Sequence, residues 1–138
     1  MTRFHSLPAV LGLLAGCFVY ADPAAGPRHG VNDAPHLSNV DASCYWDDYY
    51  GDYVWWFMVD AEDRDGADDV VVVYADVLDN WDGQVADSFE LYPDQGVTWY
   101  SAWQERSTYL DCEYYDYTVV FTASDTAENE DAVELLVY

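Results

Sequence analysis

Short apolar segments alternate with polar turn residues over most of the chain, at intervals of about ten residues. Within a segment the apolar side chains recur at every second position, which is the period of a β-strand with one buried face. The pattern predicts seven strands, at Val40–Trp46, Tyr53–Ala61, Val70–Leu78, Val85–Tyr92, Val97–Gln104, Tyr115–Ser124 and Ala132–Tyr138. No segment of useful length has the 3.6-residue period of a helix. We therefore expect an all-β domain over residues 38–138.

The alternation also assigns side chains to faces. In the second segment one row is apolar and is expected to face the core, namely Tyr53, Trp55, Phe57, Val59 and Ala61. The sixth segment has a similar row, namely Tyr117, Val119, Phe121 and Ala123. Trp56 on the second segment and Tyr74 on the third then point away from the core. These two are candidate ligand-binding residues, because exposed aromatic rings can stack on sugar rings or on a protein partner. The other interpretation is that they are covered by a neighbouring loop.

Two stretches carry a family resemblance. Phe57-x-Val59-x-Ala61-x-Asp63-x-Asp65-Gly66 resembles the second strand and following loop of bacterial Ig-like, PKD-like and cadherin-like repeats. Tyr117-x-Val119-x-Phe121-x-Ala123-x-Asp125-x-x-x-Asn129 resembles their penultimate strand and its exit loop. The resemblance implies a seven-stranded immunoglobulin-like antiparallel sandwich. It also makes Tyr117 a tyrosine-corner residue, whose hydroxyl would bond back toward Tyr109–Leu110.

The amino terminus has the pattern of a secretory signal peptide. Arg3 precedes an apolar run, Leu7–Leu14, and small residues follow it. The sequence Leu14-Ala15-Gly16-Cys17 resembles the lipobox of bacterial lipoproteins, which implies cleavage after residue 16 and a diacylglycerol on Cys17. An ordinary signal peptide cut near Ala21 or Ala25 is the other interpretation.

The lipobox resemblance implies a place in the cell and a domain organisation. Residues 1–16 would be the lipoprotein signal peptide, and residues 17–37, rich in proline and glycine, a flexible tether. The lipid on Cys17 would attach the protein to a membrane of a bacterial cell envelope. Because Phe18 rather than an aspartate follows the lipidated cysteine, the outer membrane or the cell surface is the expected site.

The chain has three cysteines, an odd number for an exported protein. Lipidation would use Cys17 and leave Cys44 and Cys112 in an oxidising compartment, where one disulfide is the simplest outcome. This disulfide would join the first strand to the segment that approaches the sixth strand.

Charge restricts the function classes. The formal net charge is −23, and all four basic residues are arginines. Such a field repels nucleic acid, so no nucleic-acid partner is expected. A hydrophobic content of 51% argues against disorder. The predicted domain has no lysine, no histidine and no free cysteine once the disulfide forms, so we expect no catalytic activity.

Acidic residues gather in the loops after the second and sixth strands. In an Ig-like topology these two loops lie at one end of the domain, and carboxylate and amide oxygens are ligands suited to Ca²⁺. The candidate metal ligands are Asp60, Asp63, Asp65, Asp125, Asn129 and Asp131. The loop is not an EF-hand, because Ala61 and Val72 would occupy ligand positions. Solvated carboxylates of an acid-rich surface are the other interpretation.

Together these patterns predict a lipid-anchored, extracytoplasmic Ig-like binding or structural module that calcium stabilises. Its expected partner is an envelope protein or a glycan. The alternative function is a carbohydrate-binding module that uses an exposed aromatic platform.

Overall fold

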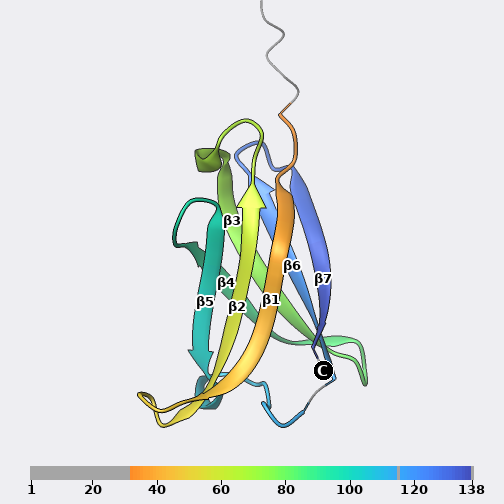
Figure 1. Cartoon of the computed structure of the whole chain (residues 1–138). Coiled ribbons are helices and arrows are strands. Elements are labelled where there is room, and N and C mark those ends of the chain that lie inside the picture. Colours follow the sequence, from red (N-terminus) through yellow and green to blue (C-terminus); the bar gives the residue numbers. More distant parts are fainter. Residues whose placement is uncertain (1–31, 115, 138) are drawn as a thin grey trace, which may run out of the picture.

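The computed structural model describes residues 32–114 and 116–137, which form seven β-strands and no α-helix (Figure 1). The strands are β1 (His36–Asp47), β2 (Asp52–Glu62), β3 (Val70–Asp79), β4 (Gln84–Pro93), β5 (Thr98–Gln104), β6 (Tyr117–Asp125) and β7 (Glu130–Val137). Two single 3-10 turns, η1 (Ala67–Asp69) and η2 (Glu105–Ser107), precede β3 and follow β5. All seven predicted strands are confirmed. The predicted signal peptide, Cys17 and most of the predicted tether lie outside the described residues.

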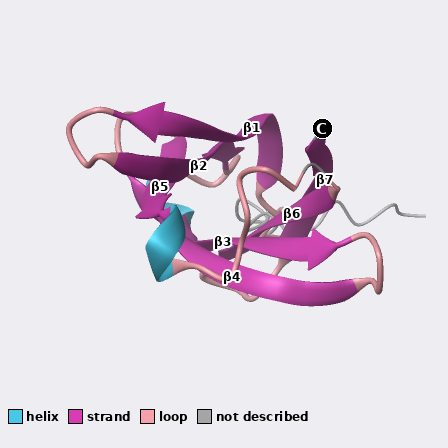
Figure 2. Cartoon of the chain, turned by 90° about the horizontal axis from the view of Figure 1, so that it is seen from below, coloured by secondary structure: helices cyan, strands magenta, loops and turns pink. Residues whose placement is uncertain are grey.

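The strands form one nearly closed antiparallel sheet in the order β1-β2-β5-β4-β3-β6-β7. The join between β5 and β4 is narrow, because only Tyr92–Tyr100 and Pro93–Trp99 are paired there. The sheet therefore consists of two blocks, β1-β2-β5 and β4-β3-β6-β7. Figure 2, seen from below, shows β1, β2 and β5 on one side of the molecule and β3 and β4 on the other, with β7 beside β1.

The core lies between the two blocks. The rings of Phe57 on β2 and Phe89 on β4 are stacked with centroids 4.8 Å apart. Trp55 on β2 meets Tyr117 on β6 edge to face, with centroids 5.8 Å apart. Neither pair joins neighbouring strands, so these contacts cross the core. The predicted inward rows are confirmed except at Tyr53, which is 37% exposed at the end of β2.

The first strand begins four residues earlier than the pattern predicts, at His36 rather than Val40. A bulge between Ser38 and Asp41 inserts an extra residue and lets the strand continue along β2. Asn39 lies in the bulge with a φ of 49°, a left-handed conformation that asparagine tolerates better than most residues. The bulge interrupts the two-residue alternation, which is why the pattern hides this part of the strand.

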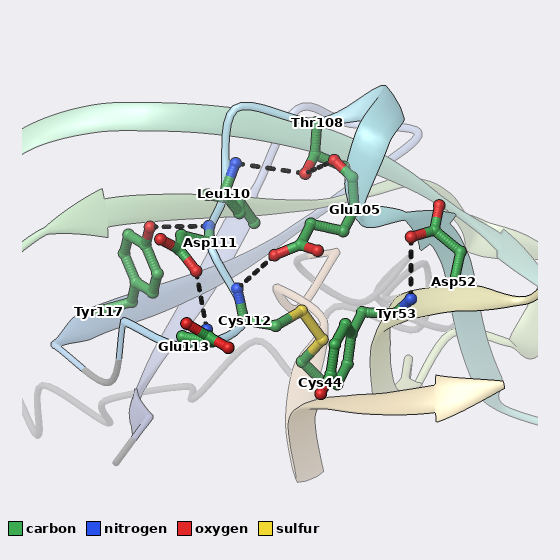
Figure 3. The surroundings of a disulfide bond; sticks show 10 residues. All are labelled: Cys44, Asp52, Tyr53, Glu105, Thr108, Leu110, Asp111, Cys112, Glu113 and Tyr117. Atoms are coloured by element: carbon green, nitrogen blue, oxygen red, sulfur yellow. Dashed lines mark hydrogen bonds between the residues drawn. A yellow bond between two sulfur atoms is a disulfide. The ribbon is translucent and has the colours of Figure 1, made fainter.

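The segment between β5 and β6 has no strand, and Figure 3 shows the disulfide and hydrogen bonds around Cys112 that help to hold it. A disulfide joins Cys44 on β1 to Cys112, with the Cα atoms 5.8 Å apart. The Cys112 N–H donates to the Glu105 carboxylate at 2.7 Å. The Asp111 N–H donates to the Tyr117 hydroxyl at 3.1 Å. The predicted disulfide is thus found between the expected elements, and the tyrosine bond falls one residue beyond the predicted segment.

The disulfide should contribute substantially to stability. It joins cysteines 68 residues apart, and closing a loop of that length is worth about 4 kcal/mol in the chain-entropy model. We expect the Cys44→Ala, Cys112→Ala double variant to lose a free energy of unfolding of this order in urea titrations. A reducing agent should lower the parent to the same value and leave the double variant unchanged. A loss below about 1 kcal/mol would contradict the prediction.

Candidate functional site

The loop after β2 and the loop after β6 meet at the upper end of the molecule in Figure 1. The Thr126 N–H donates to the Asp69 backbone carbonyl at 3.0 Å. The Thr126 hydroxyl also donates to the Asp69 carboxylate. The chain enters β1 at the same end, so residues 32–35 lie beside both loops. The predicted convergence of the two loops is therefore observed.

Three carboxylates come together where the loops meet. Asp63, Asp69 and Asp125 each offer an oxygen atom, and these oxygens all lie within 4.8 Å of one another. We call these three residues the acidic cluster. Two oxygens that bind one Ca²⁺ at about 2.4 Å can be at most about 4.8 Å apart, so the spacing suits a shared calcium ion.

Asp125 is the buried member of the acidic cluster, with 2% of its surface exposed. Its Oδ1 accepts the N–H groups of Ala127 and Asn129, both at 2.8 Å. Its Oδ2 accepts the side-chain amide of Asn129 at 2.8 Å. Burial alone would raise the pKa of Asp125, but these three hydrogen bonds favour the charged form and hold the pKa below its usual value. Asp125 is therefore an anion at neutral pH.

Two buried oxygens at this end of the molecule have no hydrogen-bond partner among the described residues. One is Asp63 Oδ2, whose companion Oδ1 accepts the Asp65 N–H at 2.7 Å. The other is Asn32 Oδ1. The Asn129 amide donates to the Asn32 backbone carbonyl at 3.2 Å, which keeps Asn32 close to the acidic cluster. A buried oxygen without a donor is costly unless a water or a cation satisfies it.

The other predicted metal ligands make different contacts. Asp60 points to the outer face of β2, where the Asn39 amide and the Thr98 hydroxyl donate to it at 2.7 and 2.6 Å. Both bonds lower the pKa of Asp60. The Asp65 carboxylate accepts the N–H of Asp33, just before β1, and the Asp131 carboxylate accepts the N–H of Leu37, at the start of β1, both at 3.0 Å. Asn129 supports Asp125, as described above.

Asp69 belongs to the acidic cluster although the predicted ligand set omits it. It immediately precedes β3, and the first residue of β3, Val70, pairs with Asp125 on β6. Strand pairing therefore brings Asp69 next to Asp125. The sequence shows that Asp69 lies just before one strand and Asp125 at the end of another, but only the antiparallel pairing of β3 with β6 shows that these two positions are neighbours.

The two candidate aromatic residues lie on different surfaces. Trp56 stacks on Tyr100 across β2 and β5, with ring centroids 5.1 Å apart, on the outer face of the first block. Tyr74 lies on the outer face of the second block, exposed, between Glu90 and Thr122 of the neighbouring strands. They do not form one platform. Trp56 instead lines a groove of about 470 Å³, together with Tyr45, Tyr50, Tyr92, Tyr100 and Trp103, which we call the aromatic groove.

No protein-family model, no curated protein and no solved structure matches the chain. The resemblance to bacterial Ig-like repeats therefore stays a prediction. Within the described ranges, no helix is long and apolar enough to cross a membrane.

The lowered pKa of Asp125 predicts a pH dependence of stability. An aspartate whose pKa is depressed by folding stabilises the folded state above its unfolded pKa, near 3.8, and this contribution is lost as the pH falls through the folded pKa. We expect the stability difference between the parent and Asp125→Asn to be largest at neutral pH and to shrink below about pH 4. Urea titrations between neutral and strongly acidic pH measure it.

Asp68→Asn is the matched control, because Asp68 is exposed in the same loop and lies outside the acidic cluster. The difference in the free energy of unfolding between Asp68→Asn and the parent should change little over the same pH range. A parent-to-Asp125→Asn difference that is constant from neutral to acidic pH would contradict the prediction.

Proposed function

We propose that the protein is a lipid-anchored, extracytoplasmic Ig-like module that binds or organises envelope partners, is stabilised by calcium and has no catalytic activity of its own. The observation that carries the calcium part is the acidic cluster, in which oxygens of Asp63 and Asp69 in the loop after β2 and of Asp125 at the end of β6 lie within 4.8 Å of one another. Two unpartnered buried oxygens at the same end of the molecule add to it.

The Ig-like part of the proposal is supported by the arrangement of the strands. The seven strands divide into a three-stranded antiparallel block, β1-β2-β5, and a four-stranded one, β4-β3-β6-β7, whose apolar faces pack together. A two-layered packing of this kind is what an Ig-like sandwich requires. The bond between the Tyr117 hydroxyl and the backbone six residues earlier is also what a tyrosine corner has.

The chemistry of the acidic cluster favours calcium over a transition metal. Its donors are oxygens only, and Ca²⁺ takes six to eight oxygens, some of them from water. Asp63, Asp69 and Asp125 would supply the charge, and Asn32 Oδ1 is a neutral oxygen close by. Without a cation the three carboxylates repel one another, which opposes the contact between the two loops.

Calcium would also fix the way the chain leaves the domain. Asp33 is joined to the loop after β2 twice, through its N–H to Asp65 and through an ion pair with Arg64 at 3.3 Å. Asn32 is joined to the loop after β6 through Asn129. An ion bound by the acidic cluster would strengthen the contact between these loops. The tether to the membrane would then leave the domain in a defined direction.

The lipid anchor and the envelope location are supported by the sequence at Cys17 and by the disulfide. A Cys44–Cys112 disulfide fits an oxidising compartment, and the signal peptide pattern fits export to it.

Calcium should raise the thermal stability of the full chain. At a tenfold excess over Kd a ligand that binds only the folded state adds about 1.4 kcal/mol, which corresponds to several degrees in Tm for a domain of this size. We expect this rise from millimolar Ca²⁺ in calorimetry at constant ionic strength. Na⁺ should give only a gradual increase through screening.

Two double variants separate binding from screening. Asp63→Asn with Asp69→Asn should abolish the calcium-induced rise in Tm. Asp68→Asn with Glu128→Gln removes the same number of charges from exposed positions of the same two loops and should retain it. The calcium proposal is wrong if Ca²⁺ and Na⁺ shift the parent equally at matched ionic strength, or if both double variants keep the rise.

Membrane attachment should depend on Cys17. Because the lipid would be carried by its thiol, Cys17→Ala should move the protein from the detergent phase to the aqueous phase in detergent phase separation or, if uncleaved, leave it with its signal peptide. Mass spectrometry of the amino terminus reports the cleavage and the acyl chains. A variant that is still cleaved after residue 16 and still partitions with detergent would refute the lipobox interpretation.

A further inference from the structure

The aromatic groove is separate from the acidic cluster and shares no residue with it. It is formed on the outer face of the first block, beside the turn that joins β1 to β2. The acidic cluster contains Asp63, the residue that follows β2. In Figure 1 the turn between β1 and β2 curves past the lower end of β5. The groove measures about 470 Å³, which is within the range of small-molecule sites.

Strand register places most of the groove residues on the outer face of the first block, whereas Trp103 pairs with Trp55 in the inward row and its ring lies 5.7 Å from that of Phe89. Tyr45 on β1 is opposite Val54 on β2, and Trp56 on β2 is opposite Ala102 on β5. Tyr92 and Tyr100 form a pair at the join between β4 and β5. Val54 is on this outer face and yet is only 3% exposed, so it lies beneath the surrounding rings. The groove therefore has an apolar base and aromatic sides.

A carboxylate without a cationic partner lines the same groove. Asp47 lies in the groove lining, and its Oδ1 accepts the N–H groups of Tyr49 and Tyr50 at 2.8 and 3.1 Å. Asp52, directly opposite Asp47 in the ladder, is paired with Arg106 at 3.3 Å. Among the described residues the only other ion pair is that of Arg64 with Asp33, so Asp47 keeps its charge unpaired.

We propose that the aromatic groove binds a small organic cation that carries a methylated ammonium group. The faces of Trp and Tyr rings attract such cations through their quadrupoles, and the methyl groups bury apolar surface against the rings. The Asp47 carboxylate adds the opposite charge on one side of the groove. The field of a chain with a net charge of −23 favours the approach of a cation from solution. A neutral sugar could stack on the same rings but would leave the charge of Asp47 uncompensated.

This inference concerns a different surface of the molecule from the calcium proposal and does not depend on it. A failure to bind an organic cation would leave the calcium-induced rise in Tm untouched. If calcium fails to raise Tm, the proposal that the aromatic groove binds an organic cation is likewise unaffected.

The test uses the full chain and two probes of the same shape. Choline carries a trimethylammonium group, and 3,3-dimethylbutan-1-ol is its neutral analogue, with carbon in place of nitrogen. We expect saturable binding of choline, followed by calorimetry or by tryptophan fluorescence at constant ionic strength. Its affinity should exceed that of the neutral analogue by about fivefold or more. Equal affinities, or no saturable binding of choline at tens of millimolar, would overturn the proposal.

Four variants locate the site. Asp47→Asn keeps the oxygen that accepts from Tyr49 and Tyr50 but removes the charge, so it should weaken choline binding severalfold and leave binding of the neutral analogue unchanged. Trp56→Leu should weaken choline binding by removing a ring. Asp48→Asn and Trp81→Leu are the matched controls, because both residues are exposed and neither lines the groove.

The controls should bind choline like the parent. The proposal is wrong if Asp47→Asn binds choline as tightly as the parent does, which remains measurable even if Trp56→Leu fails to fold. It is also wrong if a neutral oligosaccharide binds more tightly than choline and loses its affinity in Trp56→Leu, because the groove would then be a sugar site.

Discussion

The packing of two apolar faces across the core is the interaction on which the rest of this structure depends. The two strand blocks share only a short stretch of paired backbone between β4 and β5, so hydrogen bonding does little to fix one block over the other. The contacts of Trp55 and Phe57 with Tyr117 and Phe89 do this instead. Burial of large aromatic rings supplies the main stabilising free energy of such a core. The disulfide and the Tyr117 hydroxyl then attach the segment between β5 and β6 to it.

The same packing sets the positions of the two proposed sites. At one end of the molecule the paired strands β3 and β6 bring Asp69 and Asp125 together, and the loop after β2 adds Asp63. On the outer face of the first block, β1, β2 and β5 and the turn between β1 and β2 form the aromatic groove. The acidic cluster presents charged oxygens, whereas the groove presents aromatic rings and a single carboxylate. Different ligands are therefore expected at the two sites, and a ligand at one site need not affect the other.

Acidic side chains in this protein have two physical roles. Some hold the chain together, since the carboxylates of Asp60, Asp65, Asp131 and Glu105 accept hydrogen bonds from neighbouring elements. Others add charge that the described arginines do not neutralise, as in the acidic cluster and at Asp47. With a net charge of −23, repulsion opposes the compact state. Cations from solution would relieve this repulsion at the two proposed sites, where several oxygens, or an oxygen and aromatic rings, could act on one ion.

The sequence by itself determined the seven strands, their inward rows and the partner of Cys44. These features follow from the two-residue period of the pleated backbone and from a small number of cysteines, and both are readable along the chain. Tertiary structure decided which oxygens meet. Asp60 and Asp63 are close in sequence, but they lie on different surfaces because successive side chains alternate and the loop turns away from β2. Asp69 joins Asp125 only because β3 pairs with β6, and Trp56 and Tyr74 separate because their strands belong to opposite blocks. Such groupings depend on register and on the choice of neighbouring strand, which residues far apart in the chain set together.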